Sequence, residues 1–190
     1  EDSEVAIALE EYYQPRFAGD KLPSTTLGQC LSICEKIDSL VGIFAIGKAP
    51  TGDKDPFGLR RSAIGLLRII IECKLDIDLK ELIKLSVESY PAEINSNACT
   101  DDVYHFLTER LRRYYLDENV SPDTFESVLA INSSKPLDFH DRLTAVTEFR
   151  KLAEAESLAA ANKRISNILK KSDISDIKQV NNSLLVEKAE

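Results

Sequence analysis

The sequence contains no Met and no Trp, and it has only two His, His105 and His140, among its 190 residues. Nucleophilic catalysis pairs a Ser or Cys with a nearby base such as His. Both His lie on segments away from any candidate nucleophile, and no G-x-S-x-G elbow is present. Catalysis by this chain alone therefore has little support. The first residue is Glu1 rather than an initiator Met, which favours a piece of a longer protein.

Cysteine is scarce and irregularly spaced. Cys30 and Cys34 lie one helical turn apart, whereas Cys73 and Cys99 are distant from them in the sequence. Structural zinc sites use C-x-x-C pairs or combine Cys with His, and neither arrangement occurs here. We expect buried, reduced thiols, which are typical of a cytoplasmic protein, and no metal site.

Long hydrophobic runs are also missing. No apolar stretch reaches the roughly 18 residues of a membrane span, and no apolar leader opens the chain. The net charge of −8 has the wrong sign for a protein that binds nucleic acid over its whole surface, so such contacts would need local basic patches. A content of 43% hydrophobic and 29% charged residues is typical of a folded, soluble protein. Neither a membrane nor a DNA partner is expected.

Two of the seven glycines, Gly47 and Gly52, lie five positions apart in the stretch GIFAIGKAPTGDKDPFGLRR. A P-loop reads G-x-x-x-x-G-K-[ST], because its Lys reaches the outer phosphates and its hydroxyl holds magnesium. Here Asp53 stands at the Lys position, and Lys54 follows one place late. Because a carboxylate would repel a triphosphate, this loop is not predicted to bind a nucleotide.

Nearly every segment shows helical periodicity, so the predicted fold class is all-α. Thr26 is predicted to cap a helix that ends at Gly47. The Asp55-Pro56 pair is predicted to open the next helix, since Asp can accept free amides and Pro suits the first helical position. The apolar residues predicted to face inward on the first of these helices are Leu27, Cys30, Leu31, Cys34, Ile37, Val41 and Phe44.

The helix after Asp55 is predicted to have one packed face and one free face. The run LLRIII within it could also be a buried strand, but Arg68 and the capped segment favour a helix. The predicted packed face consists of Leu59, Ala63, Leu66 and Ile70, and the predicted free face of Arg61, Gly65, Arg68 and Glu72.

Further helix starts are predicted at Thr100, where acidic residues occupy the first turn, at Ser121-Pro122 and after Lys135. The stretch EAESLAAANKRISNILKK is predicted to be an amphipathic helix with Leu158, Ala161, Ile165 and Ile168 facing inward. The linker at residues 91–99 is the best candidate for a domain boundary.

Four segments carry a specific resemblance: YYQPRFAGDKLPST, CEKIDSLVGIFAIGKAPTGDKDPFGLRRSAIGLLRIIIE, DENVSPDTFESVLAI and LAAANKRISNILKKSD. They resemble, in the same order, the beta subunit of the bacterial heterotetrameric glycyl-tRNA synthetase, from about Leu9 to Asp173. The resemblance implies the later part of an HD-like helical domain over residues 1–93. Residues 94–190 would then form a helical bundle leading into the start of an anticodon-binding domain.

The same resemblance implies a division of labour between subunits. The alpha subunit of that family carries the site that uses ATP and magnesium to activate glycine, and the beta subunit binds tRNA. The implied partners are tRNA(Gly) and the alpha subunit, with no cofactor in this chain. The chain would be a non-catalytic, cytoplasmic part of a glycine–tRNA ligase complex.

Two alternatives remain open. Asp38 matches the late Asp of the HD-like pattern, so an HD-type metal-dependent phosphohydrolase is one of them. Its His partners are missing upstream, and adjacent residues such as His140 and Asp141 point about 100° apart on a helix, which is poor chelating geometry. A surface or helix-cap role is therefore predicted for His140, and a local hydrogen bond to Asp101 for His105. A purely structural adaptor for the alpha subunit is the other alternative.

Basic clusters are the remaining candidates for chemistry, because Lys and Arg neutralise phosphates while aromatic rings stack on unpaired bases. Lys54 is of interest since it directly precedes a predicted helix start, where a bound phosphate would be favoured. Solvated helix faces are the alternative, with Glu109 pairing with Arg113. The tRNA-binding candidates are Lys48, Lys54, Arg60, Arg61, Arg68, Arg110, Arg112, Arg113 (beside Tyr114 and Tyr115), Lys163, Arg164, Lys170 and Lys171.

Overall fold

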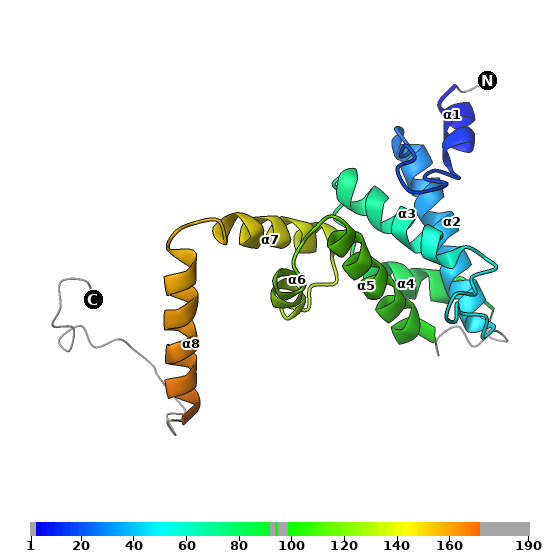
Figure 1. The fold of residues 1–190 in the computed structure, drawn as a ribbon. Helices are drawn as coiled ribbons and strands as arrows, with labels where there is room; N and C mark the ends of the chain where they lie inside the picture. The colour runs from blue at the N-terminus through cyan, green and yellow to red at the C-terminus, as the bar shows by residue number, and fades with distance from the viewer. Residues whose placement is uncertain (1–2, 92–93, 95–98, 172–190) are drawn as a thin grey trace. The chain divides into compact units, whose positions relative to one another are not determined.

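The computed structural model describes residues 3–91, 94 and 99–171, and within them the chain is built from α-helices (Figure 1). The all-α prediction is confirmed, and the run LLRIII is helical. The only extended pairing in the described residues is an isolated bridge between Thr51 and Lys54. The helices are α1 (Ser3–Glu11), α2 (Thr26–Ala45), α3 (Leu59–Glu72), α4 (Leu79–Glu88), α5 (Thr100–Asp117), α6 (Pro122–Leu129), α7 (Pro136–Phe149) and α8 (Ala155–Lys171).

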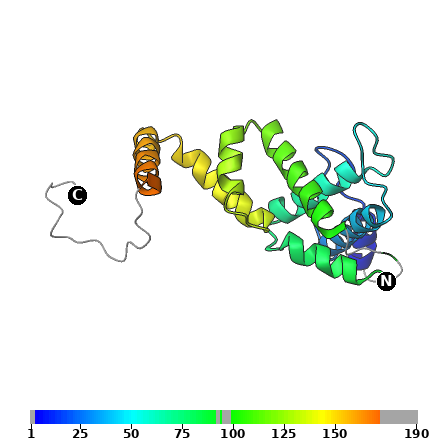
Figure 2. The ribbon, with the colours of Figure 1, turned by 90° about the horizontal axis from the view of Figure 1, so that it is seen from below.

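The chain divides into two compact units, residues 1–147 and 148–190. In the first unit α2 packs against α1, α3 and α4, and α5 packs against α2, α3 and α4. Figure 2 shows the same helices from below, with α6 beside α5. The domain division between residues 93 and 94 stays a prediction. Within the described ranges, no helix combines the length and apolar character needed to cross a membrane.

Helix α3 forms the centre of the core. Its predicted packed face is confirmed, because Leu59, Ala63, Leu66 and Ile70 are each at most 1% exposed. The opposite face is not free throughout. Gly65 is buried, and a Cβ added there would lie 2.9 Å from Cε of Lys36 on α2 and 3.2 Å from Cγ of Pro15. The segment after α1 therefore covers part of the face that was predicted to be open.

Helix α2 turns a different face inward than its periodicity predicts. Ile37 and Val41 are buried as expected, but the first half of the helix buries Gly28, Ser32 and Lys36 instead of its apolar stripe. Gly28 faces Glu11 at the end of α1, and Ser32 faces the segment that follows α1, where the Gln14 carbonyl accepts a hydrogen bond from its hydroxyl. The predicted inward residues Leu27, Cys30, Leu31 and Cys34 are exposed. The helix cap is Thr25, whose hydroxyl accepts from the Gly28 amide at 3.0 Å, rather than Thr26.

The expectation of four buried thiols is correspondingly wrong for two of them. Cys30 and Cys34 lie on the exposed face of α2, Cys73 is half-buried and Cys99 is buried. Within the described part of the chain, none of the four forms a disulfide. Burial raises the pKa of the Cys99 thiol, which keeps it protonated and unreactive at neutral pH.

The glycine loop joins α2 to α3. Gly47 has a φ of +69° and its amide donates to the Phe44 carbonyl, so α2 ends there as predicted. Helix α3 begins at Leu59, three residues after the predicted start at Pro56. Asp55 still satisfies free amides of that helix, because its carboxylate accepts from Leu59 N at 2.9 Å and from Arg60 N at 3.0 Å. The Asp55-Pro56 pair therefore predicted the capping carboxylate correctly but placed the first residue of the helix too early.

The predicted starts at Thr100, Pro122 and Pro136 are confirmed, with Ser121 as the cap of α6. Helix α8 is also present where it was predicted. Its predicted inward residues are nevertheless exposed, Leu158 to 55%, Ile165 to 55% and Ile168 to 58%, and Ala161 is exposed as well. Periodicity identifies an apolar face but not the element that covers it.

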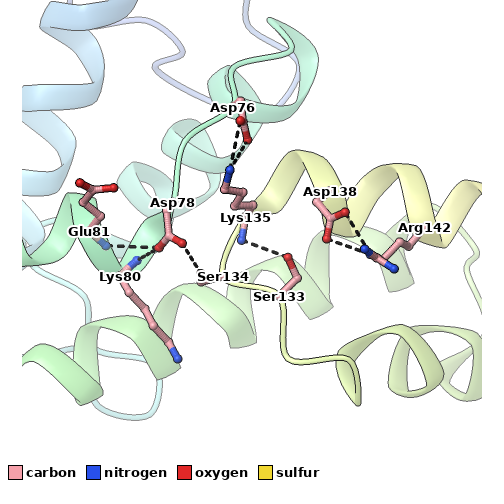
Figure 3. A network of polar contacts seen from close by, with 9 residues as sticks. All are labelled: Asp76, Asp78, Lys80, Glu81, Ser133, Ser134, Lys135, Asp138 and Arg142. Atoms are coloured by element: carbon pink, nitrogen blue, oxygen red, sulfur yellow. Dashed lines mark hydrogen bonds and ion pairs between the residues drawn. The ribbon is translucent and has the colours of Figure 1, made fainter.

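A polar network fixes the start of α7 against the connection between α3 and α4 (Figure 3). Asp78 caps α4 and also accepts from the Ser134 hydroxyl, while the Leu79 amide donates to the Ser134 carbonyl at 2.9 Å. Lys135 Nζ lies 2.9 Å from Asp76. The hydrogen bond from Ser134, opposed by partial burial, lowers the pKa of Asp78. Residues more than fifty positions apart in the sequence are thereby joined.

Candidate nucleic-acid interface

The glycine loop presents some of its cations to solvent and uses another for its own structure. Lys48, Lys54 and Arg61 are exposed. Arg60 donates from Nη2 to the Gly52 carbonyl, and the amide of Lys54 donates to the Thr51 carbonyl at 2.9 Å. Arg60 therefore closes the loop, whereas the other three cations are accessible to a phosphate.

A phosphate at the start of α3, suggested by the position of Lys54, does not fit the structure. The carboxylate of Asp55 already accepts from the amides of Leu59 and Arg60. An anion placed there would have to displace this carboxylate and would be repelled by it. Any phosphate contact by Lys54 must therefore use its side chain alone.

Arg68 does not project from the packed surface, which corrects the prediction for the free face of α3. Its side chain is 14% exposed, and its Nε lies 2.6 Å from Glu72 Oε1. Its Nη1 also donates to the carbonyl of Asp20 at 3.2 Å. Asp20 in turn is held by Arg16 Nε at 2.9 Å. Arg68 thus ties α3 to the segment that precedes α2.

Replacing Arg68 with Ala is therefore expected to lower the free energy of unfolding by about 1–2 kcal/mol, because charged hydrogen bonds and the packed aliphatic stem are lost. Arg61→Ala is the matched control, since Arg61 is exposed on the same helix, and it should change the free energy by less than about 0.5 kcal/mol. Urea unfolding followed by circular dichroism measures both. Equal stability of the two variants would contradict the structural role of Arg68.

The basic cluster on α5 is mostly occupied by contacts within the protein. Arg110 lies over the Phe106 ring at 5.3 Å. Arg112 pairs with Glu126 of α6, and Arg113 pairs with Asp117 at 3.3 Å rather than with Glu109. The neighbouring rings are not free to stack on bases, since Tyr115 is buried and Tyr114 is half-buried. This cluster holds α5 and α6 together more than it offers a surface.

Helix α8 presents four exposed cations. Lys163, Arg164, Lys170 and Lys171 are all exposed, and none forms an ion pair with an acid in the part of the chain that the structure describes. Lys163, Arg164 and Lys171 line a shallow groove of about 370 Å³ together with Asn167. At about 100° per residue these positions lie on the side of α8 away from Leu158 and Ile165. The helix therefore has a cationic side and an apolar side.

Candidate metal ligands do not converge in the described residues. Asp38 is exposed on α2 beside an apolar cleft. Among the described residues, no group of three His, Cys, Asp or Glu side chains could hold a metal ion. His140 is half-buried, with Nδ1 2.9 Å from the Tyr115 hydroxyl, so its role is packing rather than the predicted surface or cap role. His105 is exposed.

Comparison with known proteins identifies the family. Residues 1–130 match the sequence profile described as glycyl-tRNA synthetase beta subunit. Proteins named glycine–tRNA ligase beta subunit from Pseudomonas aeruginosa strain PAO1 and Klebsiella pneumoniae are each 50% identical to the chain, and the one from Colwellia psychrerythraea is 51% identical. Each alignment covers 100% of this chain and 28% of the relative, so the chain spans little more than a quarter of their length.

The match to the profile covers more than half of the chain and includes the glycine loop and the core helices α2 and α3. The alignments with the three relatives extend through α8 and its cationic side. The resemblance that the four sequence segments carry is thereby confirmed. The chain belongs to the glycyl-tRNA synthetase beta subunit family.

Proposed function

We propose that this chain is a tRNA-binding, non-catalytic part of a glycine–tRNA ligase beta subunit. In this proposal it binds tRNA(Gly) in the cytoplasm and supports the attachment of glycine by a complex whose alpha subunit uses ATP and magnesium. Residues 1–93 would be the later part of an HD-like domain, and residues 94–190 would lead into an anticodon-binding domain. Family membership and the names of the relatives support the role in glycine charging.

The cationic side of α8 is the observation that carries the RNA-binding part of the proposal. Four exposed cations, Lys163, Arg164, Lys170 and Lys171, lie within nine residues of one helix and make no ion pair with a described acid. Such a row can neutralise phosphates and release condensed counterions. The chain has a net charge of −8, so its overall composition does not explain this local cluster of cations. The cluster is therefore stronger support for an RNA contact than it would be in a basic protein.

The tRNA contact of α8 predicts a specific salt dependence. Replacing Lys163, Arg164, Lys170 and Lys171 with Ala should weaken tRNA(Gly) binding and reduce the slope of log K against log salt concentration by roughly three to four units, about 0.9 for each lost phosphate contact. Fluorescence anisotropy of labelled tRNA over a range of salt concentrations measures the slope, and circular dichroism checks that the helices persist.

The control removes the same number of cations from other sites. Lys84, Arg113, Arg142 and Lys151 are exposed but paired with acids, and their joint replacement by Ala should leave the slope nearly unchanged. Equal losses in both variants would show only a general effect of charge. An unchanged slope in the α8 variant would make its cations a solvated face.

A structural adaptor for the alpha subunit is the second candidate, and the apolar side of α8 favours it. Leu158 and Ile165 are more than half exposed on one face, a pattern that suits docking against a partner. The two functions differ in a titration of the chain with tRNA(Gly), with and without the alpha subunit. An adaptor binds the alpha subunit and has no measurable affinity for tRNA.

A further inference from the structure

A polar cleft of about 370 Å³ lies in the first unit, where the segment after α1 meets α2 and the start of α3. The segment after α1 contributes Tyr13 and Arg16, α2 contributes Lys36, and the residues around the start of α3 contribute Phe57 and Arg61. The volume lies near the lower end of the range for small-molecule sites, about 300–1,000 Å³. It is a suitable size for a single nucleotide.

Lys36 is the buried charge of this cleft. Its side chain is only 4% exposed, and its Nζ donates to the Ser32 hydroxyl at 2.9 Å. The nearest carboxylate is that of Glu35, whose Oε2 lies 3.7 Å away and whose side chain is 38% exposed. Buried charges are normally closely paired. A three-donor ammonium with one neutral acceptor and one distant acid has capacity left for an anion.

Two glycines lie against these cations. Gly65 leaves room for the Lys36 stem, because a Cβ there would lie 2.9 Å from Cε of Lys36. Gly58 has a φ of +67°, and a Cβ there would lie 2.9 Å from Nη2 of Arg61. Arg61 makes no ion pair with any described residue, whereas Arg16 is already paired with Asp20. Lys36 and Arg61 are therefore the cations available to a ligand.

Two exposed aromatic rings border the same cleft. Tyr13 is 61% exposed and Phe57 is 52% exposed, although large aromatic residues usually bury most of their surface. Exposed rings beside cations are the arrangement with which proteins hold unpaired bases, because every base offers a flat face for stacking. With Glu35 and Asp20 counted, the cleft retains one excess positive charge, which matches one phosphodiester.

We propose that this cleft binds one unpaired nucleotide of an RNA strand, with the phosphate at Lys36 and Arg61 and the base against Tyr13 or Phe57. The inference deepens the proposed function, and it rests on that function for RNA as the source of the nucleotide. It adds a contact that depends on stacking, distinct from the phosphate contacts of α8. Burial lowers the pKa of Lys36, and a bound phosphate would oppose that effect.

The test measures binding of a labelled five-nucleotide single-stranded RNA to the 190-residue chain. Tyr13→Ala and Phe57→Ala remove exposed rings, and at least one of them should weaken binding about tenfold, as expected from the loss of one base stack. Lys36→Met keeps the length of the side chain without its charge and should weaken binding about fivefold or more. The controls are Phe149→Ala for an exposed ring and Lys84→Ala for an exposed cation on α4, which contributes no residue to the cleft.

Competition identifies the ligand. The single strand should compete better than the same sequence in a duplex, a nucleoside monophosphate or inorganic phosphate. Equal competition by the duplex would overturn the claim of an unpaired nucleotide, and equal competition by the monophosphate would overturn RNA as its source. Unchanged binding in both ring variants would overturn the site even if Lys36→Met failed to fold.

The test of the cleft can fail independently of the test of the proposed function. The α8 variant should still bind the short single strand, since its altered residues lie outside the cleft. Binding of tRNA(Gly) with no effect of the ring variants on the short strand would overturn only the cleft. Binding of the short strand without any binding of tRNA(Gly) would support the cleft and contradict the proposed function.

Discussion

Replacement of Tyr115 by Ala is expected to lower the free energy of unfolding by about 3–5 kcal/mol, the range for truncating a buried aromatic residue. The Tyr115 side chain is buried, and its ring lies 5.8 Å from the Phe139 ring and 6.3 Å from the Phe125 ring. Its hydroxyl lies 2.9 Å from Nδ1 of His140. One side chain on α5 therefore joins α6 and α7, and its loss leaves a cavity among all three helices.

Two further substitutions separate the contributions of the ring and the hydroxyl. Tyr115→Phe removes only the hydrogen bond to His140 and should lower the free energy of unfolding by about 1 kcal/mol. Tyr13→Ala makes the same change of residue at a 61% exposed position and should alter it by less than about 0.5 kcal/mol. Urea unfolding monitored by circular dichroism provides the values. A loss below 1 kcal/mol for Tyr115→Ala would place the ring outside the core.

Replacing Glu11 with Ala should have the second-largest effect, a loss of about 2–4 kcal/mol at pH 7, because four hydrogen bonds to one buried carboxylate disappear together. Oε1 accepts from the amide and hydroxyl of Ser24 at 2.9 and 2.7 Å, and Oε2 accepts from those of Thr25 at 3.2 and 2.8 Å. Since Thr25 caps α2, the last residue of α1 determines how α2 begins. The matched control is Glu10→Ala, an exposed neighbour that should change little.

The effect of Glu11 should depend on pH in a defined direction. Burial acts to raise the pKa of Glu11, but the hydrogen bonds from Ser24 and Thr25 outweigh it and lower the pKa to about 2, from 4.5. A depressed folded-state pKa contributes stability that is fully present above the unfolded value and is lost as pH falls. The difference between the wild type and Glu11→Ala should thus be constant above about pH 5 and should narrow between about pH 4.5 and 2. A difference that persists unchanged at pH 2 would contradict this account.

Local signals in the sequence were reliable where one side chain acts on a neighbouring amide. Ser121 with Pro122 and the acidic turn after Thr100 mark helix starts as expected. Asp55 shows the limit of such signals, because its carboxylate caps α3 from a position outside the helix. A carboxylate can reach the same amides through more than one backbone path. The capping residue of a helix is therefore easier to predict than the residue at which the helix begins.

The family and the fold class could be predicted from the sequence. The family depends on the identity of residues in a few segments, and the fold class depends on periodicity within single helices. The sequence predicted the four characteristic segments and the packed face of α3. It did not predict which face of α2 points outward. Ser32 turns inward because the distant Gln14 carbonyl accepts a hydrogen bond from its hydroxyl, and Lys36 lies inward beside it, donating to Ser32 one turn earlier on α2. Which residues of a helix are buried depends on the segment that packs against it, and helical periodicity does not identify that segment.

The candidate sites show the same division. The sequence alone sufficed to locate the cations on α8, because four of them lie within one short helical segment. Only tertiary structure removed Arg68 from the accessible set, through a bond to the Asp20 carbonyl 48 residues away, and only tertiary structure brought Tyr13, Lys36 and Phe57 to one cleft. The physical reason is the range of the interactions. Helix periodicity and capping act within a few residues, whereas exposure, pairing and clefts are set by contacts between segments that chain order does not bring together.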